Sequence, residues 1–160
     1  MNLYIKQKLF SIGDKYNVYD ANDQLVYDVQ SEIFTIGAKI HLNDSFGREL
    51  YFIKRRVTFM CAKYEIYRGD ILCAEIQQEF RFFKPKLTIS SDYGNFEIEG
   101  DFFSWDYTIY KDGILFGSVC KKWLAWGDSY ELHAPDGSDP AFFSALVIAI
   151  DNCLHNENSN

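Results

Sequence analysis

The sequence predicts a mainly β fold, a closed antiparallel barrel of about twelve strands around a central hydrophobic C-terminal helix. Three observations lead to this prediction. Aromatic residues form 18% of the 160-residue chain, which favours strands. A motif recurs six times at intervals of 21 to 24 residues, and an apolar segment follows the last copy. The length is that of one domain, which we expect to span residues 1–160.

The repeat is clearest in its first two copies, KLFSIGDKY from Lys8 and EIFTIGAKI from Glu32. Later copies are more degraded and begin at Arg56, Glu79, Asp101 and Lys122. Turn-forming residues, such as the DYGN sequence from Asp92, lie halfway between successive copies. Each copy therefore predicts two short strands, and together the copies account for strands over residues 3–133.

Alignment of the copies separates an inward face from an outward one. Both inward columns are apolar, and we expect both in the core. The first column holds Ile5, Val29, Ile53, Ile76, Ile98 and Val119, and the second holds Leu9, Ile33, Val57, Phe80, Phe102 and Trp123. The outward columns are mostly charged or polar. Burial on one side suits an antiparallel sheet, and closure into a barrel would remove its exposed edges.

The period changes after residue 133 and indicates a helix over residues 140–155. Asp139 is a suitable capping residue, and Pro140 suits the first helical position. The segment that follows is apolar on every side, so it must be buried all round. The axis of a twelve-stranded barrel is wide enough to hold it.

The KLFSIGDKY-type motif, the KKWLAWGDSY segment from Lys121 and the PAFFSALVIAIDNCLH segment from Pro140 resemble the LURP-one-related family. That family belongs to the tubby C-terminal-like superfamily, which includes the phospholipid scramblases. The resemblance covers Leu3 to His155 and implies a closed twelve-stranded barrel around a central helix. Tubby domains bind phosphoinositides through basic residues.

Composition and motifs exclude several functional classes. A net charge of −7 argues against nucleic-acid binding. No catalytic or metal-ligand pattern accompanies the three histidines and four cysteines, so we expect no enzyme, cofactor or metal. The N-terminal residues lack the pattern of a signal peptide and no apolar stretch is long enough to span a bilayer, so we expect neither feature. We expect a cytoplasmic monomer that could associate peripherally with a membrane.

Charge is distributed unevenly along the chain. Ten-residue windows around the six motif copies hold 13 basic and 7 acidic residues, whereas the other 100 residues hold 3 basic and 16 acidic. If the motif bends gather at one end of the barrel, that end carries a basic rim. The candidate anion- or headgroup-binding residues are Lys54, Arg55, Arg56, Lys63, Arg81, Lys84, Lys86 and Lys121. The alternative is that these charges only keep the protein soluble.

Two of these candidates, Arg55 and Lys121, fall in an inward column and belong to copies three apart. They should face each other across the barrel mouth, where they would either cap the helix end near Asp151 or bind an anion. The sequence thus favours a non-catalytic binding module that contacts anionic phospholipid headgroups or a protein partner. A carrier of a small hydrophobic ligand and scramblase-like lipid handling are the alternatives.

Overall fold

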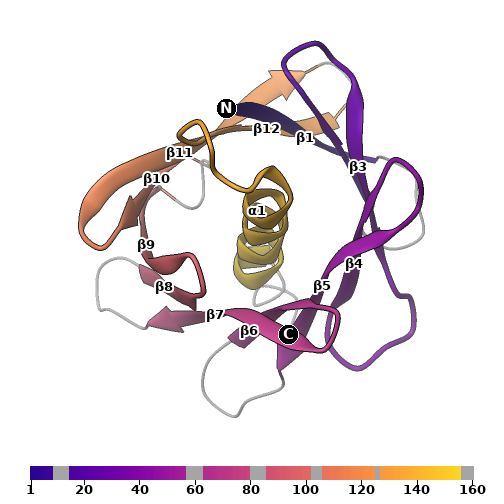
Figure 1. Ribbon diagram of the computed structural model, residues 1–160, viewed down its shortest axis with the longest axis horizontal. Helices are drawn as coiled ribbons and strands as arrows, with labels where there is room; N and C mark the ends of the chain where they lie inside the picture. The colour runs from indigo at the N-terminus through magenta and orange to yellow at the C-terminus, as the bar shows by residue number, and fades with distance from the viewer. Residues whose placement is uncertain (9–14, 57–62, 80–85, 102–105, 125–126, 156–160) are drawn as a thin grey trace.

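The computed structural model describes residues 1–8, 15–56, 63–79, 86–101, 106–124 and 127–155. Within these ranges, twelve antiparallel strands form a closed barrel in which consecutive strands pair and β1 pairs with β12. Figure 1 shows the strands as a ring around α1. The elements are β1 (Asn2–Gln7), β2 (Lys15–Tyr19), β3 (Leu25–Ser31), β4 (Lys39–Asp44), β5 (Glu49–Arg56), β6 (Lys63–Arg68), β7 (Ile71–Glu79), β8 (Lys86–Ser91), β9 (Gly94–Asp101), β10 (Asp106–Lys111), β11 (Ile114–Leu124), β12 (Gly127–His133) and α1 (Pro140–His155).

The first inward column is confirmed by the structure. All six of its residues are 0% exposed, which follows from the two-residue period of a strand with one face on the core. The prediction for Ile33 is wrong, because β3 ends at Ser31 and Ile33 lies in the loop beyond it, 46% exposed. The other members of the second column, Leu9, Val57, Phe80, Phe102 and the side chain of Trp123, lie outside what the structure describes.

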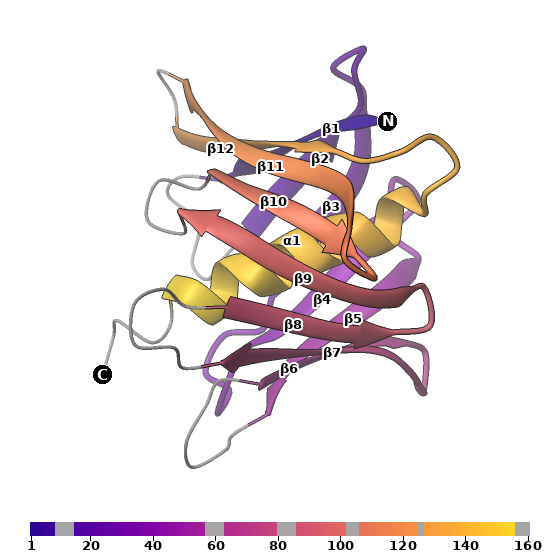
Figure 2. The ribbon, with the colours of Figure 1, turned by 90° about the vertical axis from the view of Figure 1, so that its left-hand side faces the viewer.

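The predicted axial helix is also confirmed. Residues 142–150 of α1 are each at most 2% exposed, and the helix runs along the barrel interior in both views (Figures 1 and 2). An apolar helix that is surrounded by apolar strand faces on every side buries its whole surface. This packing explains why no face of α1 carries a charged stripe.

Asp139 caps the N-terminus of α1, as the sequence predicts. Its Oδ1 accepts the Phe142 N–H at 3.0 Å. Its Oδ2 accepts the hydroxyl groups of Tyr51 at 2.9 Å and Tyr93 at 2.7 Å, and it pairs with Arg68 at 3.1 Å. Burial by itself raises the pKa of the Asp139 carboxyl. The hydrogen bonds and the Arg68 charge have the larger, opposite effect, so the pKa lies below its ordinary value.

Candidate functional site

The two ends of the barrel are built differently. The odd-numbered strands and α1 finish at one end, which we call the bend end because the motif bends connect the strands there. Figure 2 shows this end on the left, and the short hairpin turns on the right. We call the second end the hairpin end; its turns comprise residues 20–24, 44–48, 68–71, 91–94, 111–114 and 134–139. The strand order thus brings the described strand ends that flank the six motif copies to one end of the barrel.

One motif bend, the loop of residues 32–38 between β3 and β4, presents apolar side chains to solvent. Phe34 is 99% exposed, Ile36 is 91% exposed and Ile33 is 46% exposed. Gly37 has φ +81°, and the Thr35 hydroxyl donates to the Gly37 carbonyl at 2.9 Å, so the chain reverses direction tightly at this point. The loop therefore projects two large apolar groups that make little contact with the barrel.

The base of this loop is held by hydrogen bonds and ion pairs. The Glu32 N–H donates to the Lys39 carbonyl at 2.8 Å. The Glu32 carboxylate pairs with Lys39 at 3.3 Å and with His41 Nε2 at 3.0 Å, while His41 Nδ1 lies 2.5 Å from Glu49. The hydrogen bond with His41 holds the pKa of Glu32 below its ordinary value. These contacts fix where Phe34 and Ile36 leave the barrel.

Lys54 and Arg55 lie beside this loop on β5. Lys54 is opposite Lys39 in the β4–β5 pairing, and the Arg55 N–H donates to the Ala38 carbonyl at 2.8 Å. Among the described residues, neither Lys54 nor Arg55 has a carboxylate within 4.0 Å. Lys54 is exposed and Arg55 is partly buried. Two positive charges thus stand next to the exposed apolar loop, and no described carboxylate pairs with either.

The other candidates of the basic rim are placed differently. Three of them pair with carboxylates on an adjacent strand: Arg56 with Glu65 at 3.1 Å, Lys86 with Glu97 at 2.6 Å, and Lys63 with Glu75. Pairing of this kind weakens the attraction of a cation for an outside anion. Arg81 and Lys84 lie outside the described residues, and Lys121 is partly buried on β11. Of the candidates that the structure describes, Lys54 and Arg55 adjoin the apolar loop directly, through the pairing of Lys54 with Lys39 and the hydrogen bond from Arg55 to Ala38.

The strand order places Arg55 and Lys121 on opposite walls of the barrel, because β5 and β11 are six positions apart in a ring of twelve. Whether these two cations cap the helix end or bind an anion stays a prediction. Tyrosine hydroxyls also meet this helix end: Tyr16 donates to the Asp151 carboxylate, and Tyr64 donates to the Asn152 carbonyl at 3.0 Å.

Sequence reasoning missed two parts of this end. The tyrosines around the C-terminus of α1 stand at the last motif position, where four of the six copies carry Tyr16, Tyr64, Tyr107 and Tyr130, all at most 2% exposed. That recurrence was the available signal. Phe34 and Ile36 carried no such signal, because an apolar residue in a repeat that otherwise builds strands is indistinguishable from a core residue.

Comparison with known proteins identifies the family. A model of the family described as "LURP-one-related" matches residues 1–151. The chain belongs to the LURP-one-related family. A curated relative, "Uncharacterized protein YxjI" of Bacillus subtilis (strain 168), is 33% identical over 157 residues, which is 98% of this chain and 96% of that protein.

A solved structure has the same fold as this LURP-one-related protein. The X-ray structure of a protein from Arabidopsis thaliana superposes with a TM-score of 0.66 over 94% of this chain and 90% of that one, at 14% identity. In the part of the chain described here, no helix is long and apolar enough to cross a membrane. The same residues contain no group of three or more His, Cys, Asp or Glu side chains suited to holding a metal ion.

Proposed function

We propose that this LURP-one-related protein is a non-catalytic module that binds the surface of an anionic membrane through the bend end of its barrel. In this proposal, Phe34 and Ile36 enter the interfacial layer of the bilayer, and Lys54 and Arg55 contact anionic headgroups. The observation that carries the proposal is the position of two nearly fully exposed apolar side chains beside two cations that have no carboxylate within 4.0 Å among the residues that the structure describes. Apolar groups flanked by basic ones are characteristic of interfacial membrane anchors.

The magnitudes support binding by this surface. Complete removal of a Phe or Ile side chain from water contributes about 1.5–3 kcal/mol, so Phe34 and Ile36 together could contribute about 4 kcal/mol. Each basic residue close to an anionic surface adds about 1 kcal/mol. The excess of acidic residues lies outside the ten-residue motif windows. The net negative charge of the chain therefore comes from segments other than those that meet at the bend end.

A carrier function within the barrel is less well supported. Residues 142–150 of α1 occupy the barrel axis and are themselves buried, so a hydrophobic ligand at the axis would have to displace the helix. Burial of nine consecutive helical positions is a large part of the core, and its loss would be expected to unfold the barrel. Contact with a membrane at the bend end requires no such rearrangement.

Co-sedimentation with lipid vesicles tests the proposal. We expect the protein to bind vesicles of phosphatidylcholine mixed with phosphatidylserine, and to bind pure phosphatidylcholine much more weakly. Raising the salt concentration from about 0.1 M to 1 M shortens the Debye length from about 10 Å to 3 Å and should release most of the protein. Phe34→Ser with Ile36→Ser should lower the affinity by at least about tenfold, and Lys54→Glu with Arg55→Glu should abolish the preference for phosphatidylserine.

Matched variants at the hairpin end provide the controls. Phe46 is 93% exposed and the Arg48 side chain is 78% exposed, so Phe46→Ser and Arg48→Glu change similar groups at the opposite end of the barrel. They should leave vesicle binding unchanged. Equal loss of binding in the control and test variants would contradict the proposal. Absence of binding to both vesicle types at low salt would also contradict it, and would favour a protein partner at this end.

A further inference from the structure

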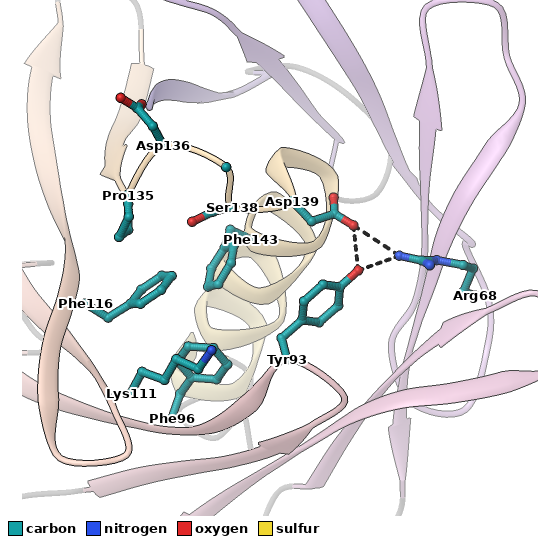
Figure 3. A pocket seen from close by; sticks show the side chains of 11 residues that line it. Arg68, Tyr93, Phe96, Lys111, Phe116, Pro135, Asp136, Ser138, Asp139 and Phe143 are labelled. Carbon is teal, nitrogen blue, oxygen red and sulfur yellow. Dashed lines mark hydrogen bonds and ion pairs between the residues drawn. The ribbon is translucent and has the colours of Figure 1, made fainter.

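The hairpin end contains a cavity of about 460 Å³ beside the N-terminus of α1. It lies between the β10–β11 hairpin, the β8–β9 turn, the connection from β12 to α1, and the first turn of the helix (Figure 3). Its volume falls within the range of small-molecule sites. The lining residues are Arg68, Tyr93, Phe96, Lys111, Phe116, Pro135, Asp136, Gly137, Ser138, Asp139 and Phe143.

Three phenylalanine rings form an apolar wall of this cavity. The centroids of Phe116 and Phe143 are 5.0 Å apart with the rings stacked, and Phe96 meets these two rings edge-on at 5.4 Å and 5.5 Å. Phe96 and Phe143 are at most 2% exposed, so they are fixed by the core and hold Phe116, whose partly exposed ring provides the accessible part of the wall. A rigid aromatic wall favours contact with a flat apolar group.

The charges around the cavity are neutralised with one exception. Asp139 is paired with Arg68, and Asp136 is paired with the N-terminal ammonium group at 2.8 Å. Lys111 has no carboxylate within 4.0 Å among the described residues. Its Nζ lies 5.9 Å from the centroid of Phe96, and Figure 3 shows its side chain alongside that ring. The cavity therefore combines an aromatic wall with a positive charge that has no carboxylate in ion-pair range within the described part of the chain.

Gly94 provides the space that Lys111 occupies. A Cβ atom at this position would lie 2.6 Å from Lys111 Cε and 3.5 Å from its Nζ. Gly94 has φ +114°, in the region that residues with a side chain rarely adopt. The turn thus leaves room for the lysine stem to lie against Phe96, which supports a defined position for the ammonium group beside the aromatic wall.

We infer that this cavity binds a small organic anion that has a flat apolar body and one carboxylate. The apolar body would pack against the exposed part of Phe116, which Phe96 and Phe143 hold in place, and the carboxylate would pair with Lys111. A charge-assisted hydrogen bond next to an apolar wall gains strength from the reduced local dielectric. This inference does not depend on membrane binding, because the cavity and the apolar loop are at opposite ends of the barrel.

Titration with 1-naphthoate, followed by amide NMR and calorimetry, tests the inference with the full chain. We expect saturable binding and chemical-shift changes concentrated in residues 135–143 and around Lys111. The neutral isostere 1-naphthylmethanol should bind about tenfold more weakly. Lys111→Met keeps the apolar stem but removes the charge, so it should weaken naphthoate binding by about tenfold and leave naphthylmethanol binding unchanged.

Lys6→Met is the matched control, because the Lys6 ammonium also lies over an aromatic ring, at 4.3 Å from the centroid of Tyr19, and Lys6 is not among the residues that line the cavity. This variant should bind both probes as the unmodified protein does. The inference is overturned if naphthoate does not bind at millimolar concentration, or if its shift changes map elsewhere. Equal affinity of naphthoate for the Lys111→Met variant and the unmodified protein would overturn the role of Lys111, provided that thermal unfolding confirms both are folded.

Discussion

Replacement of Asp139 by alanine should destabilise the protein more than any other substitution of an acidic residue at the hairpin end. The Asp139 carboxylate caps α1 through the Phe142 N–H and also accepts hydrogen bonds from Tyr51 and Tyr93 and an ion pair from Arg68. Asp139→Ala removes all of these contacts together. The same substitution leaves two tyrosine hydroxyl groups without their carboxylate acceptor at a partly buried position.

The expected loss can be estimated from these contacts. Loss of a capping side chain costs about 1 kcal/mol, and each tyrosine hydroxyl deprived of its acceptor adds about 1 kcal/mol. Arg68 is half exposed, so its ion pair contributes little in addition. The free energy of unfolding should therefore fall by about 3 kcal/mol, whereas Asp139→Asn, which retains an acceptor oxygen for the cap, should cost about 1 kcal/mol.

Urea denaturation near neutral pH measures this difference in the free energy of unfolding. The slope of that free energy against urea concentration should be unchanged, which indicates that the unfolded state is unaffected. Asp136→Ala is the control, because its 98% exposed carboxylate pairs with the chain terminus in full contact with solvent, where an ion pair contributes little. Equal effects of Asp139→Ala and Asp136→Ala would refute the reasoning. Because the pKa of Asp139 is lowered from 3.8, its contribution should be present above that pH and disappear as pH falls through the folded-state pKa.

Two further predictions concern the loop base and the core. Burial by itself lowers the pKa of His41. Hydrogen bonds with Glu49 and Glu32 have the larger, opposite effect, so the pKa is raised from 6.5. The ion pairs of His41 should stabilise the folded state by about 1 kcal/mol. This stabilisation should be present below pH 6.5, as long as both glutamates are ionised, and should be lost as pH rises through the folded-state pKa of His41. Urea denaturation of His41→Gln and of the unmodified protein at a series of pH values measures this stabilisation. His133→Gln is the control, because His133 contacts the neutral amide of Asn2. Leu146→Asp places a charge at a position that is 0% exposed and should prevent cooperative folding, whereas Leu146→Met should cost less than about 1.5 kcal/mol; circular dichroism distinguishes these outcomes.

Much of the fold could be predicted because six copies of one motif show the same pattern of inward and outward residues. Ile53 and Ile98 occupy the same place in different copies, and both are fully buried, so an error in one copy would be corrected by the others. The Asp139 cap was also predictable, since capping depends only on residues close in sequence. Local periodicity and local capping are the two kinds of structure that a single sequence records directly.

The candidate sites depend on contacts that a single sequence does not record. The pairing of Lys86 with Glu97 requires the register of β8 against β9, and the pairing of Arg68 with Asp139 joins residues 71 positions apart. Ile33 was assigned to the core because its repeat position is apolar in every copy, but the chain leaves the strand at Ser31. Whether a basic residue is available to an outside anion was therefore decided by strand register, which periodicity alone does not determine.

The axial helix makes the two proposed sites independent of each other. α1 has 16 residues and so spans about 24 Å from the cavity at its N-terminus to the bend end at its C-terminus. It is held at both ends, by Asp139 with Tyr51 and Tyr93 at the first and by the hydrogen bonds of Tyr16 and Tyr64 at the second. A ligand at one end could influence the other only by moving a helix that is packed on every side. Close-packed cores resist such sliding, so an anion in the cavity and a membrane at the bend end should be accommodated simultaneously.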